Sequence, residues 1–314
     1  MKEHKNKVKN PIKFAFLVTA VTFVAIYAWM ILFNIGLAVY ETQKLGSRAL
    51  GKAAGAELFS HNTTIIIIAY VLMEIMIVLI AGFMVKKYYK KAFKLDYIGM
   101  KVDKNSFKHL AYGFGIVAIM FTLIYFTMVT LGIMTFKGYG FVGQSPLTVL
   151  GTVLLILGTT AFPGFCEEIV YRGVIQNFLM KKMNTPLALI ICAFCFSITH
   201  IGRYQNLMSL LTIVVIGSVL GYIFAKTKSL YLPIGIHFAW DFFGSLFGVG
   251  KSIFNTNLIL VFESVKSDDF LASLIIVIAF GLLFLTVAVK YKMDEAKGHC
   301  QQSNPYEKNE RVIN

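Results

Sequence analysis

The sequence predicts an all-α, polytopic membrane protein with about eight transmembrane helices and a polar intramembrane cavity. Hydrophobic residues make up 57% of the 314 residues and charged residues only 15%. A soluble domain has about 45–50% apolar residues and about 25% charged residues. This excess indicates that lipid covers much of the protein surface. The other two observations are long apolar runs along the chain and ionisable groups inside several of them.

Eight segments have the roughly 20 mostly apolar residues that a spanning helix needs. The first exceeds the apolar core of a cleavable signal peptide, which favours a retained span. The fourth is expected to continue past Pro163 towards Met180, with an interruption or kink at Pro163-Gly164 because proline removes a backbone hydrogen bond. The predicted segments are Phe14–Tyr40, Thr63–Val85, Leu110–Phe136, Leu147–Phe162, Pro186–Ile201, Leu207–Ala225, Leu230–Val249 and Phe270–Val289.

The placement of the net charge of +14 predicts the orientation of these segments. Lysines gather in alternate loops, which all fall on one side if eight segments cross. The positive-inside rule then places both termini in the cytoplasm, with the lysines near anionic headgroups and no nucleic-acid partner. The chain is expected to be a multi-pass protein of a bacterial plasma membrane. The lysine-rich stretches are Lys2–Lys13, Lys86–Lys108, Lys181–Lys182, Lys226–Lys228 and Lys290–Lys292.

Composition also divides the chain into three regions. Residues 1–104 form two N-terminal spans and a basic cytoplasmic loop, residues 105–290 form the membrane core, and residues 291–314 form a polar tail. The four cysteines imply no disulfide framework, and the Cys192-x-x-Cys195 pair is interpreted as small buried helix residues.

A pair of glutamates in the fourth segment is the first candidate for chemistry. Glu168 and Arg172 are four residues apart, so they share a helix face and can form an ion pair that makes burial tolerable. Glu167 points about 100° away from that face. It therefore remains available, and a desolvated carboxylate beside another one suits the task of a general base. A structural ion cluster is the alternative interpretation.

Two histidines in separate segments strengthen the catalytic interpretation. His200 ends the fifth segment, and the seventh contains His237 with Asp241 one turn later. His237 and Asp241 lie on one helix face, so they can act on one point or orient each other. Together the three segments can bring water-activating and oxyanion-stabilising groups to one cavity. Glu74, alone in the second segment, is interpreted as a helix–helix contact.

These motifs resemble the pattern of the CAAX-prenyl endopeptidase and bacteriocin-processing family, known as the CPBP or Abi family. That pattern is Glu-Glu-x-x-x-Arg, then Phe-x-x-x-His, then His-x-x-x-Asn or Asp. The resemblance covers roughly residues 147–249. The matching residues are Glu167-Glu168 with Arg172, Phe196 with His200, and His237 with Asp241.

The resemblance implies an eight-helix fold with a conical cavity open to the cytosol and the membrane. Glu167 would match the base that activates water, with help from His200. His237 and Asp241 would match the pair that stabilises the oxyanion, and Glu168 with Arg172 the supporting ion pair.

The last motif position leaves a mechanistic alternative open. Asp241 stands where the eukaryotic enzymes have Asn, and an aspartate donates a hydrogen bond to an oxyanion only when it is protonated. Ionised, it would orient His237 or bind a metal. Glu167, His200, His237 and Asp241 are acceptable zinc ligands. No cofactor is expected, and zinc is the alternative.

The leading hypothesis is an intramembrane endopeptidase that hydrolyses a membrane-associated peptide or lipidated protein, with Glu167 activating the water that attacks the scissile carbonyl. The substrate would be a prenylated C-terminus in a eukaryote or archaeon, and a pheromone, bacteriocin leader or similar peptide in a bacterium. A non-proteolytic bacteriocin-immunity or membrane scaffold protein is a second hypothesis. A transporter that uses the polar cluster as a proton relay is a third, and the sequence shows no inverted repeat to support it.

Overall fold

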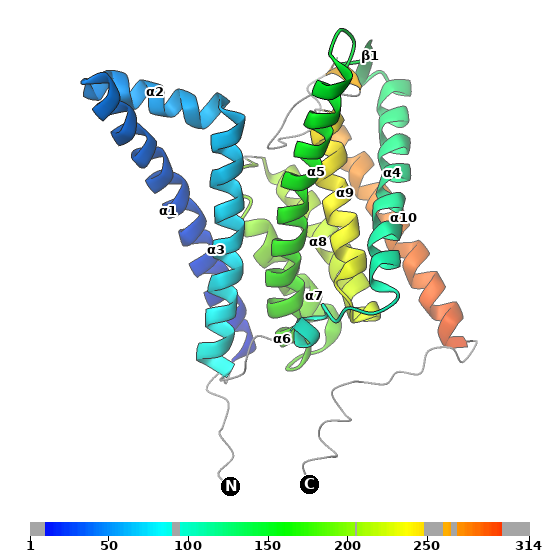
Figure 1. The fold of residues 1–314 in the computed structure, drawn as a ribbon. Coiled ribbons are helices and arrows are strands. Elements are labelled where there is room, and N and C mark those ends of the chain that lie inside the picture. The colour runs from blue at the N-terminus through cyan, green and yellow to red at the C-terminus, as the bar shows by residue number, and fades with distance from the viewer. Residues whose placement is uncertain (1–9, 90–94, 205, 248–259, 265–268, 297–314) are drawn as a thin grey trace.

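The computed structural model describes residues 10–89, 95–204, 206–247, 260–264 and 269–296. The predicted all-α membrane fold is confirmed, because nearly all of the described chain is helical (Figure 1). The elements are α1 (Pro11–Leu45), α2 (Arg48–His61), α3 (Thr63–Tyr89), the 3-10 helix η1 (Leu95–Ile98), α4 (Ser106–Thr130), β1 (Met134–Gly138), α5 (Pro146–Glu168), the π-helix η2 (Ile169–Gln176), α6 (Asn177–Met180), α7 (Thr185–Ile198), α8 (Leu207–Thr227), α9 (Tyr231–Phe247), β2 (Val261–Ser264) and α10 (Asp269–Ala296).

Six helices of the described chain are long and apolar enough to cross a membrane. The other two predicted spans correspond to α7 and α9, which have 14 and 17 residues. At 1.5 Å per residue these helices measure about 21 Å and about 26 Å, less than the ~30 Å hydrocarbon core. The chain is therefore a multi-pass membrane protein, and the count of eight crossings stays a prediction.

Two predicted segments extend too far. The segment Leu110–Phe136 includes the start of β1, because α4 ends at Thr130 and Gly132 takes a left-handed conformation with φ of 66°. The segment Pro186–Ile201 also passes the end of α7, at Ile198. Apolar composition predicts that a segment is apolar enough to lie in the membrane, but it does not predict the residue at which the helix ends.

Of the interruption or kink predicted at Pro163, the interruption is wrong, because α5 continues through Pro163 to Glu168 and becomes a π-helix only at Ile169, whereas the kink stays a prediction. Gly164 instead permits close packing against α9. A Cβ atom on Gly164 would lie 3.0 Å from the Cα of Phe238. The glycine therefore brings α5 and α9, which hold candidate residues, close together.

The N-terminal helices pack directly against the segment that contains the motifs. One hydrophobic cluster joins Phe14 and Val18 of α1 and Ile77 of α3 to Tyr171 of η2 and Cys192 of α7. The indole nitrogen of Trp29 also donates a hydrogen bond to the carbonyl oxygen of Ala69, which links α1 to α3. The division into three regions stays a prediction, as does the polar tail, most of which lies outside the described residues.

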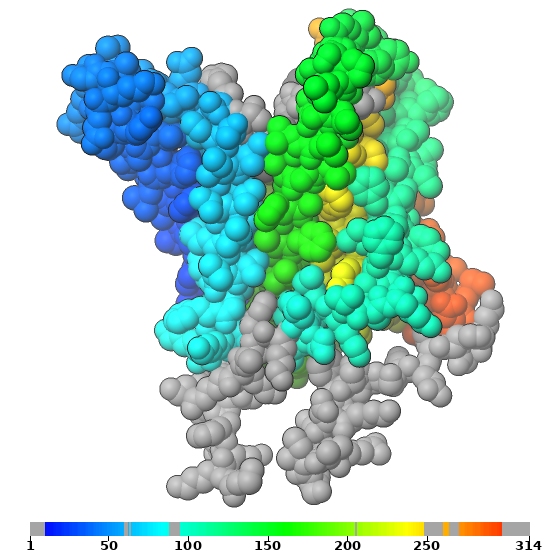
Figure 2. Space-filling view, in the orientation of Figure 1, coloured from blue at the N-terminus to red at the C-terminus, as the bar shows by residue number. Residues whose placement is uncertain are grey.

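The start of α1 and the end of α10 lie at the same end of the bundle, as the charge pattern predicts (Figure 1). At the opposite end α2 connects α1 to α3, and Figure 2 shows a notch in the surface between this arm and α5. Which side of the membrane each end faces stays a prediction. Several of the lysines on which it rests, among them Lys2, Lys90 and Lys94, lie outside the described residues.

Glycines bring α4 and α9 into backbone contact. A Cβ atom on Gly113 of α4 would lie 2.7 Å from the carbonyl oxygen of Leu232. A Cβ atom on Gly235 of α9 would overlap the carbonyl oxygen of Leu110. This contact holds the helix that contains His237 and Asp241.

We expect Gly113→Val to lower the thermal stability of the detergent-purified protein, by about 1–3 kcal/mol, because the side chain must displace backbone atoms of α9. Gly115→Val on the same helix is the matched control, since a Cβ atom added to Gly115 would meet no atom within 4 Å. Thermal unfolding of both variants measures the effect. Equal melting temperatures for the two variants would contradict this packing.

Candidate active site

One cavity of about 340 Å³ brings together the four residues that the sequence predicts as catalytic. Glu167 reaches it from the end of α5, His200 from the turn after α7, and His237 and Asp241 from α9. Three helices that are separate in the sequence therefore converge on one hollow. The volume lies in the range of small-molecule and peptide side-chain pockets.

Both imidazoles face the same oxygen atom of Glu167. Its Oε2 lies 3.9 Å from Nε2 of His200 and 3.8 Å from Nε2 of His237. Among the described residues this oxygen has no hydrogen-bond partner. The separations exceed a direct hydrogen bond, so a small donor molecule can lie between the carboxylate and the imidazoles.

The short helix α7 positions His200. This helix ends at Ile198, and the turn that follows it includes His200, which lines the cavity. Nδ1 of His200 lies 3.0 Å from the carbonyl oxygen of Phe196. Because a carbonyl only accepts, Nδ1 donates, and Nε2 is left to face Glu167. Irregular backbone within a membrane is tolerated where it lines a wet cavity.

The ion pair predicted between Glu168 and Arg172 is present and fully buried. Nη1 of Arg172 donates to Oε1 of Glu168 at 2.7 Å, and both side chains are 0% exposed. The same oxygen lies 2.9 Å from Nδ1 of His237. Glu168 therefore holds Arg172 and His237 together, and it turns Nε2 of His237 towards Glu167. The sequence did not reveal this contact, because the two residues are 69 positions apart.

Phe196 and α8 complete the surroundings of Arg172. The guanidinium lies 4.5 Å from the centre of the Phe196 ring, and its Nη2 donates to the carbonyl oxygen of Gly217 at 3.1 Å. The Phe196 ring also packs edge-on against the rings of His200 and His237, at 4.8 Å and 5.9 Å. Phe196 was identified only as a motif position, and the structure shows that its ring contacts Arg172, His200 and His237.

Asp241 lies one helical turn from His237, as predicted. Its Oδ2 is 3.7 Å from Nε2 of His237, and its side chain is 27% exposed. At this distance Asp241 could orient His237 in its ionised form or donate a hydrogen bond to an oxyanion in its protonated form. Asp241 and Glu167 therefore flank the same imidazole nitrogen.

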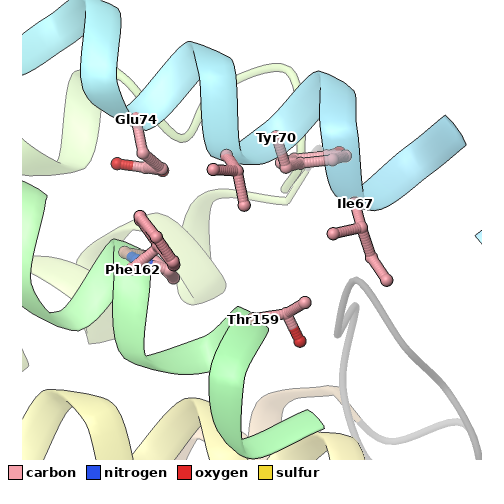
Figure 3. A pocket seen from close by; sticks show the side chains of 7 residues that line it. Ile67, Tyr70, Glu74, Thr159 and Phe162 are labelled. Carbon is pink, nitrogen blue, oxygen red and sulfur yellow. The ribbon is translucent and has the colours of Figure 1, made fainter. Parts of the chain in front are cut away.

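Glu74 of α3, which the sequence analysis interprets as a helix–helix contact, is a third carboxyl group at this cavity. It also lines a small pocket of about 10 Å³ between α3 and α5. Figure 3 shows Glu74 and Tyr70 of α3 facing Phe162 and Thr159 of α5 across this pocket. A single apolar helix gives no signal of which face turns inward, so the spacing of residues could not reveal it.

We expect Arg172→Met to destabilise the protein by about 3–5 kcal/mol, because it leaves the Glu168 carboxylate buried without its main partner. The double variant Glu168→Met/Arg172→Met removes the charge as well and is expected to recover most of that loss. Thermal unfolding in detergent measures both. If Arg172→Met unfolds at the temperature of the parent, this ion pair does not hold the site together.

Comparison with known proteins agrees with this geometry. Residues 149–243 match the sequence model of the family described as type II CAAX prenyl endopeptidase Rce1-like. The chain is also 30% identical over 101 residues to YdiL of Bacillus subtilis (strain 168), whose name designates it a candidate membrane peptidase. That match covers 32% of this chain and 40% of the relative, so the chain spans about two fifths of the relative's length. Residues 149–243, which contain all three motifs, are therefore similar to the CAAX-prenyl endopeptidase and bacteriocin-processing family.

Proposed function

We propose that this protein is an intramembrane endopeptidase that hydrolyses a membrane-associated peptide or lipidated protein. The observation that supports it best is the position of Glu167, whose Oε2 faces the Nε2 atoms of His200 and His237 and has no hydrogen-bond partner among the described residues. A carboxylate without a partner at this depth is costly unless it serves a purpose. The family match supports the same reaction class.

Activation of water is the first step of the proposed reaction. A water molecule can lie about 2.8 Å from both Oε2 of Glu167 and Nε2 of His200, because those atoms are 3.9 Å apart. Nε2 of His200 bears no proton when Nδ1 donates to Phe196, so it accepts from the water and orients it. Glu167 takes the other proton, and the hydroxide forms a bond to the scissile carbonyl carbon.

Stabilisation of the oxyanion is the second step. Nδ1 of His237 carries a proton, since the Glu168 carboxylate only accepts. In its imidazolium form His237 donates Nε2–H to the oxyanion, while Glu168 and Asp241 balance its charge. In the alternative in which Asp241 is protonated, it does not balance this charge but supplies a second donor to the oxyanion, the place that Asn takes in the eukaryotic enzymes.

Collapse of the tetrahedral intermediate is the third step. The carbonyl double bond reforms, the C–N bond breaks, and the proton held by Glu167 passes to the leaving nitrogen. Glu168 and Arg172 take no part in these transfers. Their pairing keeps His237 in place through the whole cycle.

A zinc-dependent version of the same peptidase would use Glu167, His200, His237 and Asp241 as ligands. Within the described chain, no three His, Cys, Asp or Glu side chains form a group that could hold a metal ion. The facing atoms lie 3.7–3.9 Å apart. The steps proposed above use protein side chains and water alone.

We expect Glu167→Gln to lower the rate of hydrolysis by about 10²–10⁴-fold, because the amide cannot accept the proton of water. His200→Ala is expected to lower it by a smaller factor, since Glu167 remains. The assay uses the full chain in lipid vesicles with a panel of fluorogenic peptides, prenylated and unmodified. Glu57→Gln, with an exposed side chain on α2, is the control and should match the parent.

Two results of this assay would overturn the proposal. If Glu167→Gln and His200→Ala cleave as well as the parent, or protect cells from a bacteriocin as well, an immunity or scaffold function without hydrolysis explains the chain better. If 1,10-phenanthroline abolishes the activity of the parent and zinc restores it, the metal-free mechanism is wrong while the peptidase remains.

A further inference from the structure

Glu74 lies outside the family-matched segment but faces the same cavity as the candidate catalytic residues. We propose that Glu74 is a specificity-determining residue that binds a lysine or arginine side chain of the substrate near the scissile bond. The inference rests on the proposed peptidase function and adds to it the charge of the substrate.

The first argument is the cost of placing this carboxyl group. Glu74 lies in the middle of α3 and is only 3% exposed. Among the described residues its Oε2 has no hydrogen-bond partner. An ionisable side chain inside a membrane helix is costly unless it has a partner or a function. A hydrogen-bond donor brought by the substrate would satisfy this oxygen.

The second argument is the balance of charge in the cavity. Glu74, Glu167 and Asp241 contribute three carboxyl groups, whereas the described lining contributes one guanidinium, that of Arg203, and one imidazolium, that of His237 in the proposed mechanism. Arg172 cannot compensate them, because it lies outside the cavity lining and is paired with Glu168. The cavity therefore favours a ligand that brings a positive charge.

The third argument is the shape of the wall around Glu74. Met30 of α1 and Met73 of α3 line the same cavity and offer apolar surface, and Tyr70 offers an aromatic ring. The methylene stem of a lysine or arginine packs on such surface while its charged end reaches an acceptor. An aromatic ring also attracts the cation itself.

The experiment compares paired peptides with the full chain in lipid vesicles. Each fluorogenic peptide has either lysine or the isosteric, uncharged norleucine at one position, and the position is moved along the peptide. We expect the parent to prefer lysine at one position by at least about tenfold in kcat/KM. Glu74→Gln should reduce that ratio at least about fivefold, because the amide keeps the shape and loses the charge. Glu57→Gln should leave the ratio unchanged.

A binding measurement separates this inference from the proposed function. The Kd values of the same peptides are measured with the Glu167→Gln variant, and with Glu167→Gln/Glu74→Gln. Selective binding of the lysine peptide that disappears in the double variant supports the role of Glu74, even if the parent cleaves nothing.

Two outcomes would overturn the inference. One is a parent that cleaves and binds the lysine and norleucine peptides equally at all positions. The other is a Glu74→Gln variant that folds but loses activity on both peptides by the same factor, which would place Glu74 in the chemistry or the packing instead.

Discussion

The site depends on one buried carboxylate, that of Glu168. Its Oε1 accepts from Arg172 at 2.7 Å and from His237 at 2.9 Å, and its side chain is fully buried. Losing Arg172 would leave the Glu168 carboxylate buried without its main counter-charge, and losing His237 would remove the contact between Glu168 and α9, so the three side chains hold η2 and α9 in one arrangement. The carbonyl oxygen of Gly217 and the ring of Phe196 complete the surroundings of Arg172 and bring in α8 and α7.

In this arrangement Glu168 has a structural role and the neighbouring Glu167 is free to take part in the proposed reaction. Glu168 is buried and its Oε1 is paired with Arg172 and His237, whereas Oε2 of Glu167 faces the cavity with no partner among the described side chains. The short helix α7 ends at Ile198, and the turn that follows it places His200 opposite Glu167. The polar hollow is thus a consequence of a helix that ends early and of charges that compensate one another.

Local spacing predicted much of this site, and long-range contacts account for what it missed. Glu168 with Arg172 and His237 with Asp241 are each one turn apart, so helix geometry alone placed them on shared faces. The contact of Glu168 with His237 depends on how α5 and α9 pack, which no spacing reveals. The inward face of Glu74 was missed for the same reason. The end of α4 and the continuity of α5 through Pro163 depend on backbone conformation and tertiary packing, whereas hydropathy reports only burial.

The central claim is that Glu167, His200 and His237 share one wet hollow within the membrane. A cryo-EM structure of the chain in a lipid nanodisc, at a resolution that shows ordered water, tests it most directly. The account predicts a water molecule within hydrogen-bond distance of Oε2 of Glu167 and Nε2 of His200, with Nδ1 of His237 on Glu168. Side chains that face separate directions, or an acyl chain filling the space between them, would contradict it.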